Sequence, residues 1–170
     1  SGGLWSLDLK ERSLGWDLHP PCPGGQRIQP YFVNAKLGDG SESLFVFGGR
    51  QSGKGILQDS WRYVPDEREW RSLADLPRRL AGGGVFSAGP SHILLLPNLG
   101  GYFSESFQGL KSGALPSPAP IYAFHTLTET WVDCQPSVPF DAKAAISAVK
   151  WRDGFALFSL LRSVESVDED

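Results

Sequence analysis

The stretch of sequence that decides the fold runs from residue 44 to residue 82 and reads LFVFGGRQSGKGILQDSWRYVPDEREWRSLADLPRRLAG. It begins with an apolar run that ends in the doublet Gly48-Gly49, and a polar loop then leads into the segment 60–65. Apolar and polar residues alternate in that segment, which is typical of a half-buried β-strand. A polar turn follows, and Trp70 opens the next short strand. The stretch therefore predicts short strands separated by turns and loops.

The same pattern occurs twice more in the chain. Segments 4–9 and 121–126 alternate in the same way, and each leads through a polar turn to a tryptophan, Trp16 or Trp131. A second apolar strand is predicted in each unit, at 43–47, 92–96 and 154–158. The closing tryptophans Trp16, Trp70 and Trp131 are 54 and 61 residues apart. The repeating unit is therefore four strands in about 50 residues.

This unit resembles the kelch repeat, which has a Gly-Gly doublet after its second strand, an aromatic residue in its third and a tryptophan in its fourth. The resemblance is strongest over residues 44–82, at Phe47, Gly48, Gly49, Asp59, Trp61, Tyr63, Trp70, Leu73, Pro77, Arg79 and Gly82. In the other two units Pro97-Asn98 and Ser159-Leu160 stand in place of the doublet. The resemblance implies an all-β chain, a kelch-type β-propeller built from four-stranded blades.

The blade boundaries follow from the repeats. We expect about three blades' worth of a propeller in residues 1–160, and closed propellers typically have four to eight blades. The chain is therefore expected to be about half of a six-bladed ring, closed by a missing second half or by self-association. The expected parts are a half blade at 1–23, a blade at 27–76, a blade at 79–138 with an insertion at 97–120, a half blade at 143–160 and an acidic, disordered tail at 161–170.

Composition excludes several classes of function. The 170 residues carry 16 Lys and Arg against 19 Asp and Glu, so a basic footprint for nucleic acid is not predicted. No apolar run approaches the roughly 20 residues of a membrane helix, so no membrane insertion is predicted. The 20 glycines and 13 prolines accompany six tryptophans, which indicates frequent turns rather than disorder. Because the chain contains no methionine, we expect it to be processed or a fragment. Cys22 and Cys134 are expected to be free thiols, although a pair between them stays open.

The insertion narrows the resemblance to one branch of the kelch proteins. After residues 97–120 come Phe124-His125-Thr126, then Thr130-Trp131, and later Ala148-Val149-Lys150-Trp151. This order resembles the cyclically permuted mutarotases, which include the N-acetylneuraminate epimerases (sialic acid mutarotases). The resemblance implies a periplasmic or secreted protein, a small carbohydrate ligand, general acid/base catalysis of anomer exchange, and no cofactor.

The resemblance fails after Ser159. The family continues with a Gly-Glu-x-x-Pro-x-x-Arg segment that supplies a proton-transfer Glu and a carboxylate-binding Arg. Here Arg162 and Glu165 stand in a different order and spacing, so neither role is transferred to them and the catalytic residues stay unassigned. We expect this chain alone to be inactive, and the alternative hypothesis is a non-catalytic kelch scaffold that binds a protein or a glycan.

Candidate binding residues come from three patterns. Cations recur where a first strand is expected to begin, and they are expected either to converge on an anionic ligand in the central channel or, as the favoured interpretation, to bond carbonyls of the neighbouring blade. Loop residues at one end of the blades are further candidates, either for contact with a ligand or for stabilising the turn. Aromatic residues of the insertion are candidates either for stacking on a sugar or for forming the small core of the loop itself. The candidates are Arg27, Arg79, Lys143, Arg50, Asn98, Tyr102 and Phe103.

The remaining polar motifs predict no chemistry. His19, His92 and His125 are isolated in sequence, so no metal site is expected. The segment Gly53-Lys54-Gly55 lacks the spacing of a phosphate-binding loop and is interpreted as a turn between strands.

Overall fold

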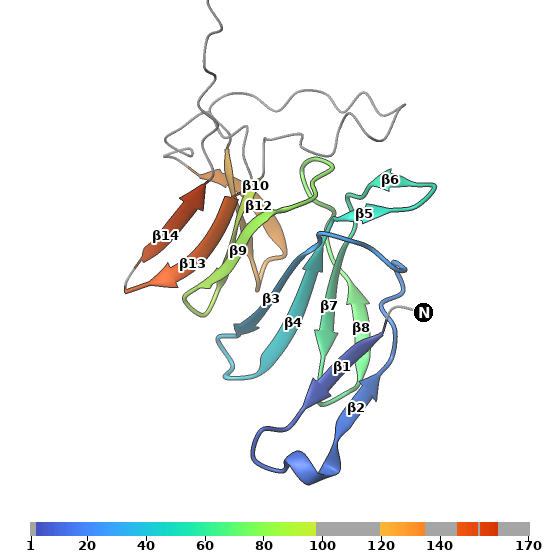
Figure 1. The fold of residues 1–170 in the computed structure, drawn as a ribbon. Coiled ribbons are helices and arrows are strands. Elements are labelled where there is room, and N and C mark those ends of the chain that lie inside the picture. The colour runs from blue at the N-terminus through green and yellow to red at the C-terminus, as the bar shows by residue number, and fades with distance from the viewer. Residues whose placement is uncertain (1–2, 98–119, 135–145, 153, 160–170) are drawn as a thin grey trace, which may run out of the picture.

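The fold is known from a computed structural model, which describes residues 3–97, 120–134, 146–152 and 154–159 (Figure 1). Within these ranges the chain is all-β apart from one 3-10 turn at Arg12–Leu14. The strands are β1 (Leu4–Leu7), β2 (Trp16–His19), β3 (Tyr31–Lys36), β4 (Glu42–Phe47), β5 (Arg50–Gln51), β6 (Gly55–Ile56), β7 (Ser60–Val64), β8 (Glu69–Ser72), β9 (Gly83–Ala88), β10 (His92–Pro97), β11 (Ile121–His125), β12 (Thr130–Cys134), β13 (Ile146–Trp151) and β14 (Gly154–Ser159).

The strands form two four-stranded antiparallel sheets and several hairpins. One sheet has the order β3-β4-β7-β8 and the other the order β9-β10-β11-β12. The hairpins β1-β2 and β13-β14 are two-stranded sheets, and β5-β6 is a short hairpin inside the loop between β4 and β7. Figure 1 shows β13-β14 beside β9 and β1-β2 beside β7 and β8. The predicted all-β class is confirmed, and the predicted turn at Gly53-Lys54-Gly55 lies at the tip of β5-β6.

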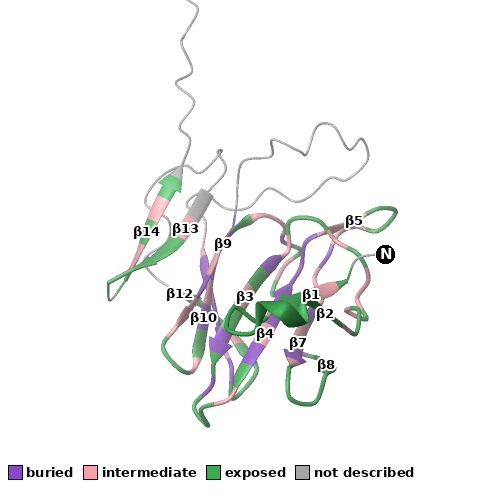
Figure 2. Ribbon diagram, turned by 60° about the horizontal axis from the view of Figure 1, so that its bottom comes forward, coloured by how far each residue is buried: buried purple, intermediate pink, exposed green. Residues whose placement is uncertain are grey.

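Burial follows the strand period. In β3, Tyr31 and Ala35 are buried while Phe32 and Asn34 between them are exposed, because successive side chains of a strand point to opposite faces. Figure 2 shows buried residues along β3, β4, β7 and β10, whereas β1, β2, β13 and β14 are mostly exposed or intermediate. The two complete sheets therefore carry the core, and the two outer hairpins carry little of it.

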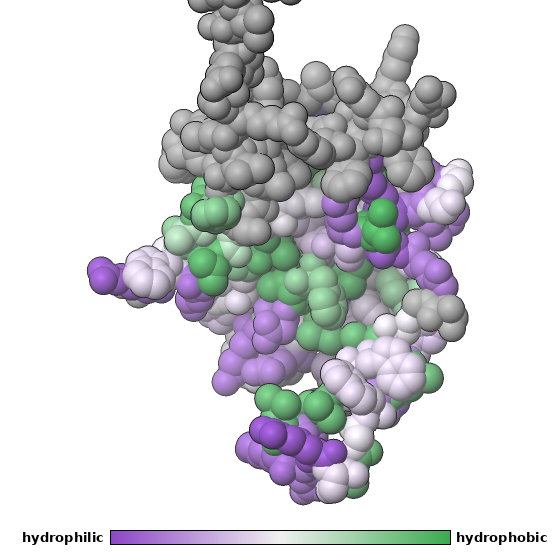
Figure 3. All heavy atoms as spheres, viewed as in Figure 1, coloured by the Kyte–Doolittle hydropathy of each residue, from purple (hydrophilic) through white to green (hydrophobic). Residues whose placement is uncertain are grey.

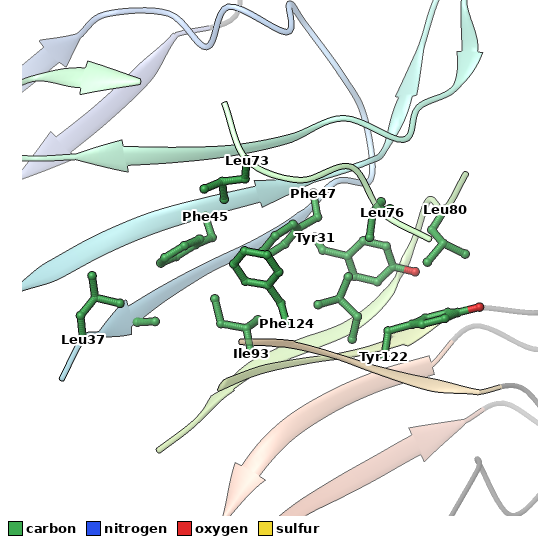
Figure 4. Close-up of a cluster of buried hydrophobic side chains, with 12 residues drawn as sticks. Tyr31, Leu37, Phe45, Phe47, Leu73, Leu76, Leu80, Ile93, Tyr122 and Phe124 are labelled. Atoms are coloured by element: carbon green, nitrogen blue, oxygen red, sulfur yellow. The ribbon is translucent and has the colours of Figure 1, made fainter. Parts of the chain in front are cut away.

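The main core lies between the two complete sheets (Figure 4). Phe45 and Phe47 of β4 pack against Phe124 of β11, with the Phe47 and Phe124 rings 5.4 Å apart and edge-on. Trp131 of β12 closes this aromatic group, 4.8 Å from Phe124. Edge-on aromatic pairs at such separations are favourable beyond the apolar area they bury. These interlocked rings hold the second sheet against the first.

A smaller core joins the second sheet to the β13-β14 hairpin. Phe86 of β9 and Leu96 of β10 are buried there, and the partly buried Phe155 and Leu157 of β14 pack against them. The Phe86 and Phe155 rings are 4.7 Å apart. The contact repeats the packing of the main core one unit further along the chain.

The glycine doublet of the first unit is required by its surroundings. Gly48 has φ +53°, a conformation that residues with a Cβ adopt at a cost. A Cβ at this position would clash with the backbone carbonyl oxygen of Leu80. The Gly48 amide donates to the Asp59 carbonyl at 3.0 Å, and the Gly49 amide donates to the Leu80 carbonyl at 2.9 Å. The doublet therefore lets the end of β4 approach two loops at once.

Candidate functional site

The candidate site is the end of the blades at which β4 finishes, and it is built from three loops. The chain before β3, the Gly48-Gly49 doublet and the segment 77–82 meet there through backbone hydrogen bonds. Ile28 and Arg50 exchange two of these bonds, at 2.8 and 2.9 Å, and the Gly82 amide donates to the Gln29 carbonyl at 2.9 Å. Loops fixed in this way on a sheet scaffold are where binding residues usually collect.

Arg27 lies inside this loop cluster, four residues before β3 begins. Its Nη1 and Nη2 donate to the two carboxylate oxygens of Asp59, each at 2.8 Å, and Nη1 also donates to the Gly48 carbonyl at 3.0 Å. The Trp61 Nε1 donates to the same carboxylate at 2.6 Å. The Arg27 side chain is only 5% exposed. Its guanidinium is thus held by Asp59 and by the end of β4.

The charge of Asp59 is stabilised by these partners. Burial by itself raises the pKa of Asp59, but the hydrogen bonds from Arg27 and Trp61 outweigh it and hold the pKa below its usual value. A bidentate arginine–carboxylate pair is among the strongest side-chain interactions. The contacts of Arg27 are those of a structural residue, and its role toward a ligand stays a prediction.

Arg79 occupies the equivalent place before β9. Its Nη1 donates to the Ile56 carbonyl at 2.9 Å, and the residue is exposed. Ile56 belongs to the β5-β6 hairpin in the loop between β4 and β7, so this arginine ties the loop before β9 to a loop of the first complete sheet. Both arginines lie in the loops before the first strands and not on the strands, which differs from the predicted placement at the strand starts.

Arg50 differs from Arg27 and Arg79, whose guanidinium groups bond a carboxylate or a carbonyl of another loop. It is half-buried on β5, directly after the doublet. Among the residues that the structure describes, its buried Nε has no hydrogen-bond partner, and neither has the buried Oε1 of the adjacent Gln51. A guanidinium group is the side chain that binds a carboxylate best. Arg50 is therefore the strongest binding candidate in the described part of the site.

Two tyrosines of the core direct their hydroxyls toward this end. Figure 4 shows the hydroxyls of Tyr31 and Tyr122 on the side of the cluster where Leu80 lies. Burial is the main cause that raises the pKa of Tyr122, Asp133 raises it further, and Arg78 beside the hydroxyl opposes the shift. Tyr122 is therefore protonated near neutral pH and able to donate a hydrogen bond. Sequence reasoning missed both tyrosines, because each stands in a predicted strand where an aromatic residue is expected to pack in the core.

Four of the candidate residues lie outside the described residues: Lys143, Asn98, Tyr102 and Phe103. Of the candidates, the structure thus places only the three arginines, and it brings Arg27 and Arg50 to one loop cluster through Gly48 and Ile28. Cys22 and Cys134 are half-buried free thiols. Within the described ranges no three His, Cys, Asp or Glu side chains gather as metal ligands would, and no helix is long and apolar enough to cross a membrane.

The histidines are less isolated in space than in sequence. The rings of His92 and His125 are 4.7 Å apart on neighbouring strands. His19 of β2 lies in a chain of polar groups, with its Nε2 2.7 Å from the Ser6 hydroxyl and its Nδ1 2.8 Å from the Tyr63 hydroxyl. These groups border a cavity of about 380 Å³ between the β1-β2 hairpin and the first complete sheet. No sequence spacing indicated this contact, because it joins three separate strands.

Comparison with known proteins gives the following similarities, while no family model matches the chain. It is 41% identical over 115 residues to the N-acetylneuraminate epimerases of Haemophilus influenzae strains PittEE and 86-028NP, which covers 64% of this chain and 28% of theirs. It is 31% identical over 90 residues to beta-scruin of Limulus polyphemus, a kelch protein, which covers 53% of this chain and 9% of beta-scruin. The chain thus spans little more than a quarter of the length of the epimerases it matches. Together with the four-stranded antiparallel sheets, these similarities support a kelch-type family and confirm kelch-type propeller blades as the fold.

Proposed function

We propose that this chain contributes to a kelch propeller that binds N-acetylneuraminate or a related acidic pyranose and interconverts its anomers. The similarity to the two N-acetylneuraminate epimerases, 41% over 115 residues, carries this proposal. A periplasmic or secreted location belongs to the same proposal, since the enzyme branch that the sequence resembles is exported.

The chemistry divides between recognition and proton transfer. Anomers of a pyranose exchange through the open-chain sugar, so one group must take the proton of the anomeric hydroxyl while another protonates the ring oxygen. An acidic sugar also needs a cation for its carboxylate, which an arginine binds best. Arg50 is proposed for this recognition. No residue of this chain is assigned to proton transfer, so the 170-residue chain is expected to bind the sugar without turning it over.

Binding is tested with two arginine variants. Saturation-transfer NMR of N-acetylneuraminate is measured on the folded wild-type chain, on Arg50→Gln and on Arg68→Gln. Losing a charge-assisted hydrogen bond costs about 1.5–3 kcal/mol, so Arg50→Gln should weaken binding by about 10- to 150-fold. Arg68 pairs with Asp17 at the surface, so Arg68→Gln is the matched control and should bind as the wild type does. Equal binding by all three proteins would remove Arg50 from the site.

Turnover is measured separately by exchange NMR on the same sugar. The folded 170-residue chain should leave the anomer exchange rate at its value in buffer, because the Gly-Glu segment that supplies the proton-transfer Glu in the resembled family does not follow Ser159. Acceleration by this chain would contradict that expectation and would locate the acid and base within residues 1–170.

The absence of the family's Gly-Glu segment after Ser159 favours a second function, a non-catalytic kelch scaffold. Such a scaffold would bind a protein or a glycan through the same loops. A folded chain that binds no N-acetylneuraminate at millimolar concentration would support this alternative and count against the mutarotase proposal.

A further inference from the structure

The two complete sheets can be compared position by position, and they differ at one charged contact. Arg27 stands four residues before β3, and Asp59 stands directly before β7. In the second sheet Arg79 stands four residues before β9, but the residue directly before β11 is Pro120. The arginine therefore recurs in the second sheet, whereas the carboxylate that binds it in the first sheet does not.

The missing carboxylate goes together with a different use of the arginine. Arg27 donates to both carboxylate oxygens of Asp59, and its side chain is only 5% exposed. Arg79 is exposed, and its Nη1 donates to the Ile56 carbonyl in a loop of the first complete sheet. A guanidinium carries five N–H donors. Among the described residues this carbonyl is the hydrogen-bond partner that Arg79 has, so most of its donors stay available.

Arg79 and Arg50 lie on the two sides of Ile56. Arg50 is the cross-strand partner of Ile56 in the β5-β6 hairpin. Because the backbone of Arg50 exchanges its hydrogen bonds with the chain before β3, the Ile56 carbonyl points away from β5, and Arg79 bonds it from there. The Gly49 amide, next to Arg50, donates to the carbonyl of Leu80, next to Arg79, at 2.9 Å. Backbone hydrogen bonds thus hold the two arginines on neighbouring segments.

These two cations have no counterion in the described part of the chain. The ion pairs found there involve neither Arg50 nor Arg79. Asp59, a carboxylate of the same loop end, already holds Arg27. Figure 3 shows mostly hydrophilic side chains on the side of the molecule where Figure 1 places the β5-β6 hairpin. An anionic ligand would relieve the repulsion between the two guanidinium groups.

We propose that Arg79 is a second arginine of the ligand site, whose charge selects ligands that carry a carboxylate. The inference rests on the proposed function, in which Arg50 contacts the carboxylate of an acidic pyranose. Arg79 attracts the same carboxylate from the other side of Ile56, and it is free to do so because Pro120 stands where its own sheet would need an aspartate. Arg79 therefore raises the affinity for the acid and determines specificity without taking part in proton transfer.

The expected effect is moderate, because water reaches an exposed arginine. Loss of the Arg79 charge should weaken binding of N-acetylneuraminate by about 3- to 10-fold, which is what attraction across roughly 8–10 Å gives between the screening of water and that of a protein surface. Salt screens such an attraction, so the loss should become smaller as NaCl rises from about 20 mM to about 500 mM. A residue that only supports the loop would give a loss independent of salt.

The first test is calorimetric titration of the folded 170-residue chain with N-acetylneuraminate at low and at high salt. Arg79→Gln should bind more weakly than the wild type at low salt, whereas Arg79→Lys keeps the charge and should bind nearly as well as the wild type. Arg71 pairs with Glu67 at the surface of β8, so Arg71→Gln is the matched control and should bind as the wild type does.

The outcomes separate this inference from the proposed function. If the wild type binds N-acetylneuraminate and Arg79→Gln binds it equally well at low salt, the role of Arg79 is refuted and the proposed function stands. If Arg79→Lys binds as weakly as Arg79→Gln, the selection by charge is refuted. If the wild type does not bind N-acetylneuraminate, both the proposed function and the inference are overturned.

The second test restores the missing carboxylate. Pro120→Asp places an acid where Asp59 stands in the first sheet, so it should bind Arg79 as Asp59 binds Arg27. We expect Pro120→Asp to weaken binding of N-acetylneuraminate at least as much as Arg79→Gln does, and the matched control Pro120→Ala to bind as the wild type does. Pro120→Asp should also unfold at a higher urea concentration than Pro120→Ala, and this difference should disappear when Arg79→Gln is added. Equal binding by the two Pro120 variants overturns the claim that the missing carboxylate makes Arg79 available.

Discussion

Replacing Asp59 by asparagine tests whether the loop end of the blades is held by the Arg27–Asp59 pair. The change keeps the shape of the side chain and removes its charge. An asparagine amide nitrogen cannot accept a hydrogen bond, so at least one of the three donors on the carboxylate, two from Arg27 and one from Trp61, loses its partner.

The magnitude follows from the burial of the two partners. Breaking a buried ion pair by removing one partner costs about 3–5 kcal/mol, because the remaining charge stays buried without compensation. Arg27 is 5% exposed but Asp59 is 31% exposed, which lets water reach the site. The lower end of the range applies, and Asp59→Asn should lower the free energy of unfolding by about 3 kcal/mol.

The assay is urea unfolding followed by tryptophan fluorescence, with Asp17→Asn as the control. Asp17 also pairs with an arginine, Arg68, but both side chains are about half exposed. An exposed pair of this kind contributes little to stability, because water and salt screen its charges. If Asp59→Asn destabilises the chain no more than Asp17→Asn does, the structural role assigned to Arg27 is refuted.

Three further predictions concern the same scaffold. Gly40→Ala should lower the free energy of urea unfolding by about 1 kcal/mol, because its positive φ strains a residue with a Cβ although no atom lies near that Cβ. Gly48→Ala should lower it by at least twice as much, because the new Cβ also meets the Leu80 carbonyl oxygen, and equal costs would count against the packing described for the doublet. The folded-state pKa of Asp59 lies below its unfolded value of 3.8, so its contribution to stability is present above about pH 4 and is lost as the pH falls through the folded pKa. The difference in unfolding free energy between the wild type and Asp59→Asn should therefore become smaller from pH 5 to pH 3, and a difference that grows would contradict the direction assigned to this pKa. Trp70→Phe should lower the free energy of unfolding by about 1 kcal/mol through loss of its hydrogen bond to Pro20, measured by calorimetry, and no change would show that this contact is not formed.

The strands were predictable because their signals are local. The alternation of Ser60-Trp61-Arg62-Tyr63 gives β7, and the recurring tryptophan marks β2, β8 and β12. The kelch-type fold followed from the order of these signals and is confirmed by the four-stranded sheets.

The side-chain partners were not predictable from such signals. Arg27 and Asp59 are 32 residues apart, and nothing in their spacing indicates that they meet. The different partners of the arginines were likewise not predictable. Arg27 bonds a carboxylate and Arg79 a carbonyl, whereas the Nε of Arg50 has no partner among the described residues. The proposed ligand roles of the seven candidate residues stay predictions.

The measurement that tests the functional account most directly is calorimetric titration of the folded chain with N-acetylneuraminate and, in parallel, with its methyl ester. The two ligands differ only in the carboxylate that Arg50 is proposed to bind. We predict measurable binding of the acid and at least tenfold weaker binding of the ester. Equal affinity for both ligands, or no binding of either, would contradict the proposal that this chain forms part of a site for an acidic sugar.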